Sequence, residues 1–438
     1  MPNPREEKAS IGQRVLWQMD HHRGGHGALN CPLLLRLDGP LDVAALQAAI
    51  DALALRHEAL RTTFVGRGPR LRQLIHAEPL PLAITELDIG EATTQENGLV
   101  EAIAGEVQTP TDIGERPIRL TLWKLAAERR VLCMNMHHLT TDGWSTALVA
   151  NELGRLYRAI VADGPDLPAV DWQYADWAEW HHRQLEGERL RRMRTYWRER
   201  LAGAKLPELP RRHSDVPLLE RRTNVERRLL DADTVKAMQA LARTFSTAFF
   251  TCLLAVYYVL LSHETGEGDL AVGSIFANRS RREAQSTVGF LSNMVVLRTR
   301  LSRRATFAEV IRAADDTVIG AFSHQELPFQ MLPLDTIAAE SMRPDAIVFQ
   351  LFAGPMAPAK IGGVAFEPII DVPEGIGNRW ELELSLAPAP DGLAVLLSYA
   401  RDLYDGRWAS SFLDGYVALA SALARRPNIP SASAALAG

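Results

Sequence analysis

The residues best suited to chemistry stand together in one stretch, His137-His138-Leu139-Thr140-Thr141-Asp142-Gly143-Trp144-Ser145. A histidine can move protons near neutral pH when its ring is held and a second group sets its tautomer. Gly143 permits a sharp turn and lets another molecule approach the backbone closely. Asp142 lies four residues after His138, at the start of the following helix, so it can cap that helix or accept a salt bridge.

Several kinds of site fit this motif to different degrees. Adjacent side chains on an extended strand point to opposite faces, so one histidine faces a cavity and the other packs behind it. The two histidine rings therefore cannot easily bind the same metal ion. A nucleophilic triad is poorly supported, because no Gly-x-Ser-x-Gly elbow is present and Ser145 falls in the first turn of a helix. A bare His-x-x-x-Asp spacing is common and by itself is most often structural.

The flanking patterns place the motif on a loop between a strand and a helix. Strands are predicted at Ile118–Leu125 and Arg130–Met136, joined by the charged turn Ala127-Glu128-Arg129. Apolar residues at helical spacing then predict an amphipathic helix over Trp144–Ile160. Loops carried on such a scaffold are where catalytic groups are usually found.

The rest of the chain alternates between helical and strand patterns, which predicts the α/β class with two similar lobes. One long charged helix is expected from Tyr174 through Arg200. The other predicted helices are Ser10–Trp17, Leu41–Leu60, Gly98–Val107, Asp233–Phe245, Ala248–Ser262 and Phe307–Phe322. The other predicted strands are Pro32–Leu37, Leu71–Ile75, Leu82–Leu87, Asn224–Leu230, Asp269–Phe276 and Met294–Thr299.

Length and composition limit the choices further. A chain of 438 residues exceeds what one core usually fills, and the turn-rich break after Asp163 favours lobes at residues 1–175 and 176–438. The net charge of −5 argues against nucleic acid as the main partner. Cys31, Cys133 and Cys252 lack metal-binding spacing and indicate a reducing compartment. With no long apolar run and no secretory signal, we expect a cytoplasmic protein without a membrane span.

The motif resembles the His-His-x-x-x-Asp-Gly signature of the condensation domains of nonribosomal peptide synthetases. Five flanking segments resemble that family in the same order: Ser10–Trp17, Arg56–Phe64, Tyr174–Trp180, Val288–Asn293 and His324–Phe329. The closing segment Tyr399–Asp405 is also similar. Two departures are Gly12, where alanine is usual, and Arg343–Phe349, which matches the usual late motif only loosely.

The resemblance implies a fold of two chloramphenicol acetyltransferase-like α/β sandwich lobes arranged in a V, with an active-site tunnel at the seam. It implies natural-product biosynthesis, in which an acyl group passes from a carrier-protein thioester to an amine or hydroxyl to form an amide or ester. The acceptor is a small molecule or is itself bound to a carrier. No metal and no resident cofactor are implied, since the phosphopantetheine arm belongs to the partner carrier protein.

The resemblance also assigns roles to single residues. His138 is the central catalytic residue, and His137 packs behind it in support. Asp142 is structural and pairs with Arg61, while Gly143 lines the donor side of the tunnel and its amide faces the oxyanion. Trp144, Ser292 and Asn293 are expected along the tunnel.

A cluster of arginines between Arg189 and Arg228 is simply explained as a solvated helix face. The sharper hypothesis is docking of an acidic carrier protein or of its phosphopantetheine phosphate, with Arg191 and Arg192 as the residues to test.

Two alternatives to this function remain open at this stage. One is a related acyltransferase that uses coenzyme A or polyketide-carrier thioesters, and the other is a non-catalytic module that only recruits carriers. The intact histidine motif argues against the second. No adenylation or carrier segment is visible between Met1 and Gly438, which suggests a free-standing enzyme, and a domain cut from a longer protein would look the same.

Overall fold

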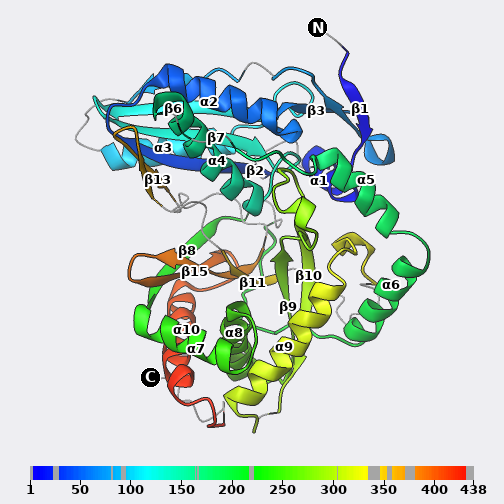
Figure 1. Ribbon diagram of the computed structural model, residues 1–438. Helices are drawn as coiled ribbons and strands as arrows, with labels where there is room; N and C mark the ends of the chain where they lie inside the picture. The colour runs from blue at the N-terminus through cyan, green and yellow to red at the C-terminus, as the bar shows by residue number, and fades with distance from the viewer. Residues whose placement is uncertain are drawn as a thin grey trace. The chain divides into compact units, whose positions relative to one another are not determined.

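The computed structural model describes residues 3–22, 29–79, 82–89, 95–162, 164, 167–216, 221–302, 304–333, 346–352, 358–369 and 380–430. Contacts divide the chain into two compact units, each with its own large sheet (Figure 1). The first unit comprises Met1–Leu185, Ala277–Ser292 and Gly354–Ile376. The second comprises Glu186–Phe276, Asn293–Ala353 and Gly377–Gly438.

The main sheet of the first unit is mostly antiparallel, and only its last pair, β5 with β6, is parallel. Its strands, in spatial order, are β12 (Ala359–Ile361), β13 (Val364–Pro368), β2 (Asn30–Asp38), β7 (Arg129–His137), β6 (Ile118–Ala126) and β5 (Thr85–Asp88). Strands β12 and β13 come from late in the chain. Strand β13 pairs with β2, so the first unit includes a segment that a boundary at residue 175 assigns to the other lobe.

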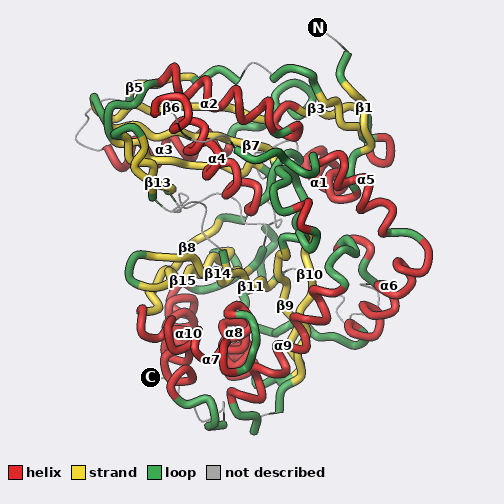
Figure 2. The backbone as a smooth tube through the Cα atoms, in the orientation of Figure 1, coloured by secondary structure: helices red, strands yellow, loops and turns green. Residues whose placement is uncertain are grey.

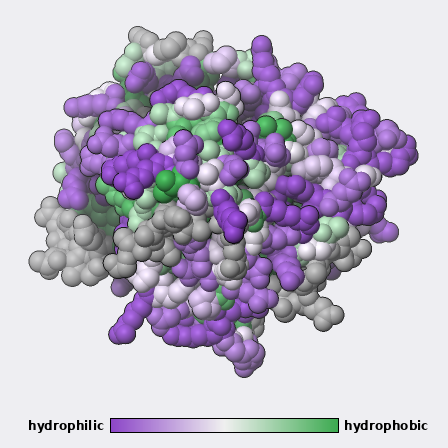
Figure 3. Space-filling view, turned by 90° about the horizontal axis from the view of Figure 1, so that it is seen from below, coloured by the Kyte–Doolittle hydropathy of each residue, from purple (hydrophilic) through white to green (hydrophobic). Residues whose placement is uncertain are grey.

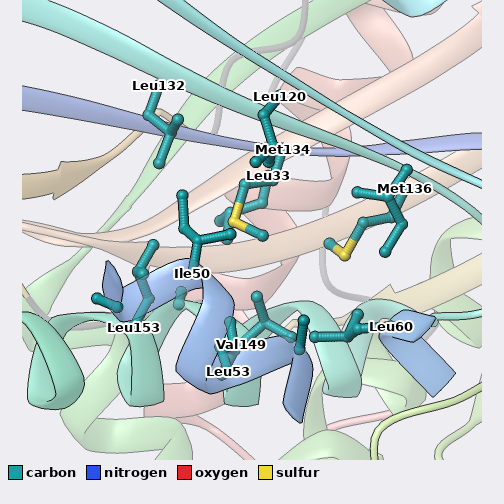
Figure 4. Packing of buried hydrophobic residues seen from close by; sticks show 14 of the residues in the cluster. Leu33, Ile50, Leu53, Leu60, Leu120, Leu132, Met134, Met136, Val149 and Leu153 are labelled. Carbon is teal, nitrogen blue, oxygen red and sulfur yellow. The ribbon is translucent and has the colours of Figure 1, made fainter. Parts of the chain in front are cut away.

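Strand β7 alternates between the two faces of this sheet. Its residues Leu132, Met134 and Met136 pack against helices α2 (Val43–Arg56) and α4 (Gly143–Ala162), as Figure 4 shows. Its residues Val131 and Cys133 instead belong to a smaller cluster with helix α3 (Gln95–Gln108). Because side chains alternate along a strand, the residue that follows β7 continues the face of Met134 and Met136.

A small second sheet and two helices complete the first unit. The sheet contains β1 (Arg5–Lys8), β4 (Arg72–Ile75) and β3 (Thr62–Val65), which follows the 3-10 helix Glu58–Arg61. Helix α1 (Ile11–His22) begins with a reciprocal cap: Gln13 N–H donates to Ser10 Oγ, and Ser10 N–H donates to the Gln13 side chain, both at 3.0 Å. This satisfies two amides that a helix start leaves without partners.

The sheet of the second unit is mixed, because β11 runs parallel to both of its neighbours. Its strands, in spatial order, are β10 (Asn293–Arg300), β9 (Asp269–Phe276), β11 (Ile347–Leu351), β14 (Leu382–Ala389), β15 (Gly392–Ala400) and β8 (Thr223–Asp231). Figure 2 shows the helices that follow α6 in this unit gathered on one side of the sheet. They are α7 (Ala232–Thr244), α8 (Phe249–Thr265), α9 (Phe307–Ser323) and α10 (Gly406–Arg425).

Helix α8 is the centre of the second core, since every residue from Thr251 to Leu261 is buried. A helix that is apolar all round must be covered on all sides, and α7, α9, α10 and the sheet strands β9 and β11 supply that cover. The outer surface is different, and the face seen in Figure 3 is mostly hydrophilic. Among the described residues no single helix has the length and apolarity to cross a membrane, and α7 with α8 pass only as a pair bent by 108°.

The secondary structure confirms most of the predicted elements, with one clear correction. The expected long helix from Tyr174 to Arg200 is two helices, α5 (Tyr174–Gln184) and α6 (Gly187–Leu201). The chain turns between them because Leu185 N–H closes a tight turn on the His182 carbonyl and Gly187 takes a left-handed φ of 56°. Glycine adopts that conformation without the steric cost that other residues have. Of the loosely matched segment Arg343–Phe349, residues 343–345 lie outside the described part of the chain.

The 3-10 helices Gly68–Arg70, Arg282–Ala284 and Phe329–Met331 are short connections. The middle one lies in the segment Ala277–Ser292, which packs closely on α5. A Cβ atom at Gly289 would lie 1.9 Å from the ring of Tyr174, so only glycine fits there. The hydroxyl of Tyr174 donates to the Phe290 carbonyl at 2.9 Å, so the same side chain also fixes the segment by a hydrogen bond.

Candidate active site

The histidine motif forms the predicted loop between β7 and α4. The loop is closed by two hydrogen bonds to the His137 carbonyl, from Thr140 N–H and Thr140 Oγ1, each at 2.9 Å. Asp142 then caps α4, since Ser145 N–H donates to its Oδ1 at 2.8 Å. The loop conformation is therefore set by local hydrogen bonds between its own residues.

His137 and His138 point to opposite faces, as the alternation of a strand requires. His137 is only 2% exposed, and its Nδ1 accepts a hydrogen bond from Leu139 N–H at 3.1 Å. A ring nitrogen that accepts carries no proton, so in the neutral ring the proton is on Nε2. That Nε2 faces Asp20 Oδ1 at 3.8 Å. Thus His137 packs within the first unit, as predicted.

His138 has the opposite tautomer. Its Nδ1 lies 2.9 Å from the Thr141 carbonyl oxygen, which can only accept, so the Nδ1 carries the proton. The lone pair of the neutral ring is then on Nε2, which lies 3.7 Å from Cys31 Sγ. The ring edge packs against Phe290, with centroids 5.6 Å apart. His138 is only partly buried, so its Nε2 is the basic atom that the loop presents.

Asp142 is a buried residue that joins the loop to the segment Ala277–Ser292. Its carboxylate is 1% exposed and binds the guanidinium of Arg279 through two hydrogen bonds, at 3.0 and 3.1 Å. Its Oδ2 also accepts from Leu291 N–H at 3.0 Å and from the amide and hydroxyl of Ser292, both at 2.9 Å. Burial alone would raise the pKa of Asp142, but the charge and hydrogen bonds of Arg279 lower it to about 2.

Both terminal nitrogens of the Arg279 guanidinium have further acceptors. They donate to Ser145 Oγ at 2.8 Å and to the carbonyls of Ala277 and Thr287 at 3.0 and 3.2 Å. Within the part of the chain that the structure describes, only the Nε of this side chain has no hydrogen-bond partner. A bidentate Arg–carboxylate pair whose terminal donors are all engaged is a geometry in which a buried ion pair is well held.

The predicted partner of Asp142 is therefore wrong: it is Arg279 and not Arg61. Arg61 ends the 3-10 helix Glu58–Arg61, and its guanidinium donates to the His76 carbonyl and lies 3.7 Å from Glu58. These two acceptors keep the Arg61 side chain beside Glu58 and His76. Arg279 is 137 residues from Asp142 in the chain, so nothing local in the sequence links the two. The sequence gives only one indication that Arg279 could be this partner: it is an arginine that shortly follows the apolar pattern of β9.

Gly143 and Trp144 form the exposed first turn of α4. A Cβ atom at Gly143 would meet no atom of the described residues within 4 Å, so they leave the space beside Gly143 open. The indole N–H of Trp144 donates to the Gln285 carbonyl at 3.0 Å, and the Arg279 guanidinium lies 5.7 Å from the Trp144 ring centroid. The first amides of a helix have no partner within it, so this end favours a negative group.

Ser292 and Asn293 are neighbours in sequence but bind different parts of the structure. Ser292 donates to Asp142 with both its amide and its hydroxyl. Asn293 begins β10 in the second unit, where its Nδ2 donates to the carbonyls of Gln325 and Leu327 at 2.7 Å. Its Oδ1 accepts from Phe329 N–H at 3.0 Å. Asn293 thus ties the turn after α9 to the second unit's sheet.

The predicted arginine cluster is largely engaged in contacts of the second unit. Arg189 pairs with Glu326, Arg211 and Arg221 pair with Glu381, Arg212 pairs with Asp405, and Arg228 pairs with Asp414. Arg191 and Arg192 are exposed on α6, and Arg191 pairs with Glu188 one turn earlier. Exposed pairs of this kind are weak, so Arg191 and Arg192 lie on a solvent-facing basic side of α6, together with the exposed Arg194 and Arg198.

Comparisons with known proteins agree with the motif. A family model described as "Condensation domain" matches residues 6–437. One polypeptide of the linear gramicidin synthase from Brevibacillus parabrevis is 29% identical over 439 residues, which cover 98% of this chain and 6% of that protein. The chain therefore spans only a small part of the curated relatives it matches.

Solved structures show the same fold. SgcC5 from Streptomyces globisporus, crystallised with (R)-(−)-1-(2-naphthyl)-1,2-ethanediol and sucrose, has a TM-score of 0.79 at 27% identity. That match covers 97% of this chain and 100% of SgcC5. The first condensation domain of the calcium-dependent antibiotic synthetase has a TM-score of 0.82 at 20% identity, over 99% of this chain and 100% of that one. The predicted fold class is confirmed.

The Asp142–Arg279 pair predicts a strong energetic coupling. Arg279→Gln should lower the free energy of unfolding by about 3–5 kcal/mol, because it leaves the Asp142 carboxylate buried without its counter-charge. Arg61→Gln is the matched control and should cost only about 1–2 kcal/mol, from its local hydrogen bonds. In urea titrations, a double-mutant cycle with Asp142→Asn should give a large coupling for Arg279 and almost none for Arg61. The reverse order would contradict the pairing.

The low pKa of Asp142 also predicts how stability depends on pH. A carboxyl whose pKa falls from 3.8 to about 2 on folding stabilises the protein above pH 4 and loses that contribution as pH falls towards 2. The excess free energy of unfolding of the wild type over Asp142→Asn should therefore shrink by about 2 kcal/mol between pH 5 and pH 2. Unfolding measured by circular dichroism at several pH values tests this, and a constant difference would contradict it.

Proposed function

Because the chain belongs to the condensation domain family, we propose that it transfers an acyl or aminoacyl group from a carrier-protein thioester to an amine or hydroxyl. The product is an amide or an ester. The curated relatives are peptide synthases, which supports a place in nonribosomal peptide assembly. The SgcC5 structure holds a diol, which supports including alcohols among the acceptors.

The observation that carries this proposal is the fixed tautomer of His138. With Nδ1–H held by the Thr141 carbonyl at 2.9 Å, Nε2 carries the lone pair that accepts a hydrogen bond from the attacking amine or hydroxyl. As the nucleophile adds to the thioester carbonyl, its proton passes to Nε2, and a positioned base of this kind contributes about 10²–10⁴-fold. The imidazolium that forms keeps its hydrogen bond to Thr141.

The start of α4 is suited to the negative charge that develops on the carbonyl oxygen. The open space beside Gly143 admits a substrate, and an amide in the first turn of the helix donates to the oxyanion. The tetrahedral intermediate then collapses, the carbon–sulfur bond breaks, and the phosphopantetheine thiol leaves with the proton from His138. The acyl group is then bonded to the acceptor, and every proton is accounted for.

The carrier protein supplies the phosphopantetheine thiol, so the transfer requires no cofactor of the chain's own. The basic helix α6 is the candidate docking element, because Arg191 and Arg192 are exposed there and carrier proteins that are acidic would complement them. Asp142 and Arg279 take no part in proton transfer. They hold the loop that carries His138.

Mass spectrometry of products formed from a carrier-loaded acyl donor and a panel of amines and alcohols tests this function. The wild type should form the amide or ester, and His138→Asn should lower turnover by about 10²–10⁴-fold because the base is lost. His213→Asn, the same substitution at a histidine whose side chain is 89% exposed, serves as the matched control for expression and handling. Wild-type-like turnover by His138→Asn would refute the central role of His138.

The donor chemistry is tested in the same assay. The same acyl group offered on free coenzyme A should react much more slowly than the carrier-bound form. Efficient transfer from coenzyme A would favour the related acyltransferase instead. A folded protein that transfers nothing from either donor would favour a recruitment module.

A further inference from the structure

A second reactive side chain, Cys31, lies at the candidate site. Cys31 is the second residue of β2 and stands opposite Met136 of β7 in the sheet. Beyond the end of the β2–β7 pairing, His138 N–H donates to the Leu29 carbonyl at 2.8 Å. Side chains that are diagonal across two paired strands are close enough to interact. This register places Cys31 Sγ 3.7 Å from His138 Nε2.

The three cysteines of the chain differ sharply in their surroundings. Cys31 is partly exposed, whereas Cys133 and Cys252 are fully buried. Burial, together with the charge of Glu106, raises the pKa of Cys133 far above its ordinary value. Burial, together with the charge of Asp315, raises the pKa of Cys252 to about 12. Since the thiolate is the nucleophile, Cys133 and Cys252 are expected to be inert in the folded protein.

The geometry around Cys31 has the three parts of an activated nucleophile. These are a thiol, a base within reach of it, and a third group that orients the base. His138 Nε2 is the base, and the Thr141 carbonyl orients the ring through Nδ1 at 2.9 Å. All three groups belong to the first unit, so the arrangement is internal to it.

We propose that Cys31 is a site of covalent modification by small electrophiles, with His138 as the base that accepts the thiol proton. In the reaction with iodoacetamide, a bond forms between Sγ and the methylene carbon, the carbon–iodine bond breaks, and iodide leaves. The proton of the thiol passes to Nε2 and from there to water. The adduct then lies against the atom on which acyl transfer depends, so modification stops turnover.

The modification and its consequence depend on different premises. Labelling of Cys31 and its dependence on His138 rest on the described contacts alone. Loss of turnover rests in addition on the proposed function. A wild-type enzyme that labels at Cys31 but never transfers acyl groups would thus refute the function and leave the modification site standing.

The test is alkylation of the whole native chain with iodoacetamide near pH 7, followed by peptide mass spectrometry over time. Cys31 should be labelled first, and its labelling rate should match the rate at which turnover is lost. A cysteine is only a few per cent thiolate at this pH, so a base partner raises its reactivity appreciably. His138→Asn should therefore slow the labelling of Cys31 by about 10-fold.

Cys133 and Cys252 act as internal controls for folding, since they should stay unlabelled in each variant until denaturant is added. Cys31→Ala should keep whatever turnover it has after iodoacetamide treatment, which shows that inactivation proceeds through this thiol. Three results would overturn the proposal: an unchanged labelling rate in a folded His138→Asn variant, labelling of Cys133 or Cys252 before Cys31, or full turnover in a protein alkylated at Cys31.

Discussion

The salt bridge between Asp142 and Arg279 is the interaction on which the candidate site depends. Asp142 is both the cap of α4 and the acceptor for the segment that carries Leu291 and Ser292. One buried carboxylate thus fixes the loop, the helix that follows it and a segment from far along the chain. A carboxylate buried this deeply is tolerated only because its oxygens accept hydrogen bonds and pair with a positive charge. Ser145 strengthens the arrangement, since its hydroxyl accepts from Arg279 and from Gly289 N–H.

Within this arrangement, two adjacent histidines acquire different chemistry from their hydrogen bonds. The Leu139 amide donates to His137 Nδ1, whereas the Thr141 carbonyl accepts from His138 Nδ1. The two neutral rings therefore hold their protons on different nitrogens, and only His138 leaves a basic nitrogen on a partly exposed side chain. The same Nε2 lies beside the Cys31 thiol. The proposed acyl transfer and the proposed modification thus compete for one atom.

The sequence predicted what depends on local patterns. Alternation along β7 separates His137 from His138, and the apolar spacing after Trp144 indicates α4, because both signals lie within a few residues. The partner of Asp142 was missed because Arg61 and Arg279 are chemically equivalent and only the packing of the segment Ala277–Ser292 distinguishes them. The break at Gly187 was missed because one glycine inside a charged helical pattern is often tolerated. The pairing of β13 with β2 has no local signal at all.

The most direct test of this account is the tautomer of each histidine in the motif. Long-range ¹⁵N–¹H correlation spectra of protein labelled at histidine nitrogens distinguish protonated from unprotonated ring nitrogens. The substitutions His137→Gln and His138→Gln assign the two rings. At a pH where both rings are neutral, we expect the proton on Nδ1 of His138 and on Nε2 of His137. A proton on Nε2 of His138 would contradict the account, because that nitrogen would then have no lone pair for the acceptor's proton.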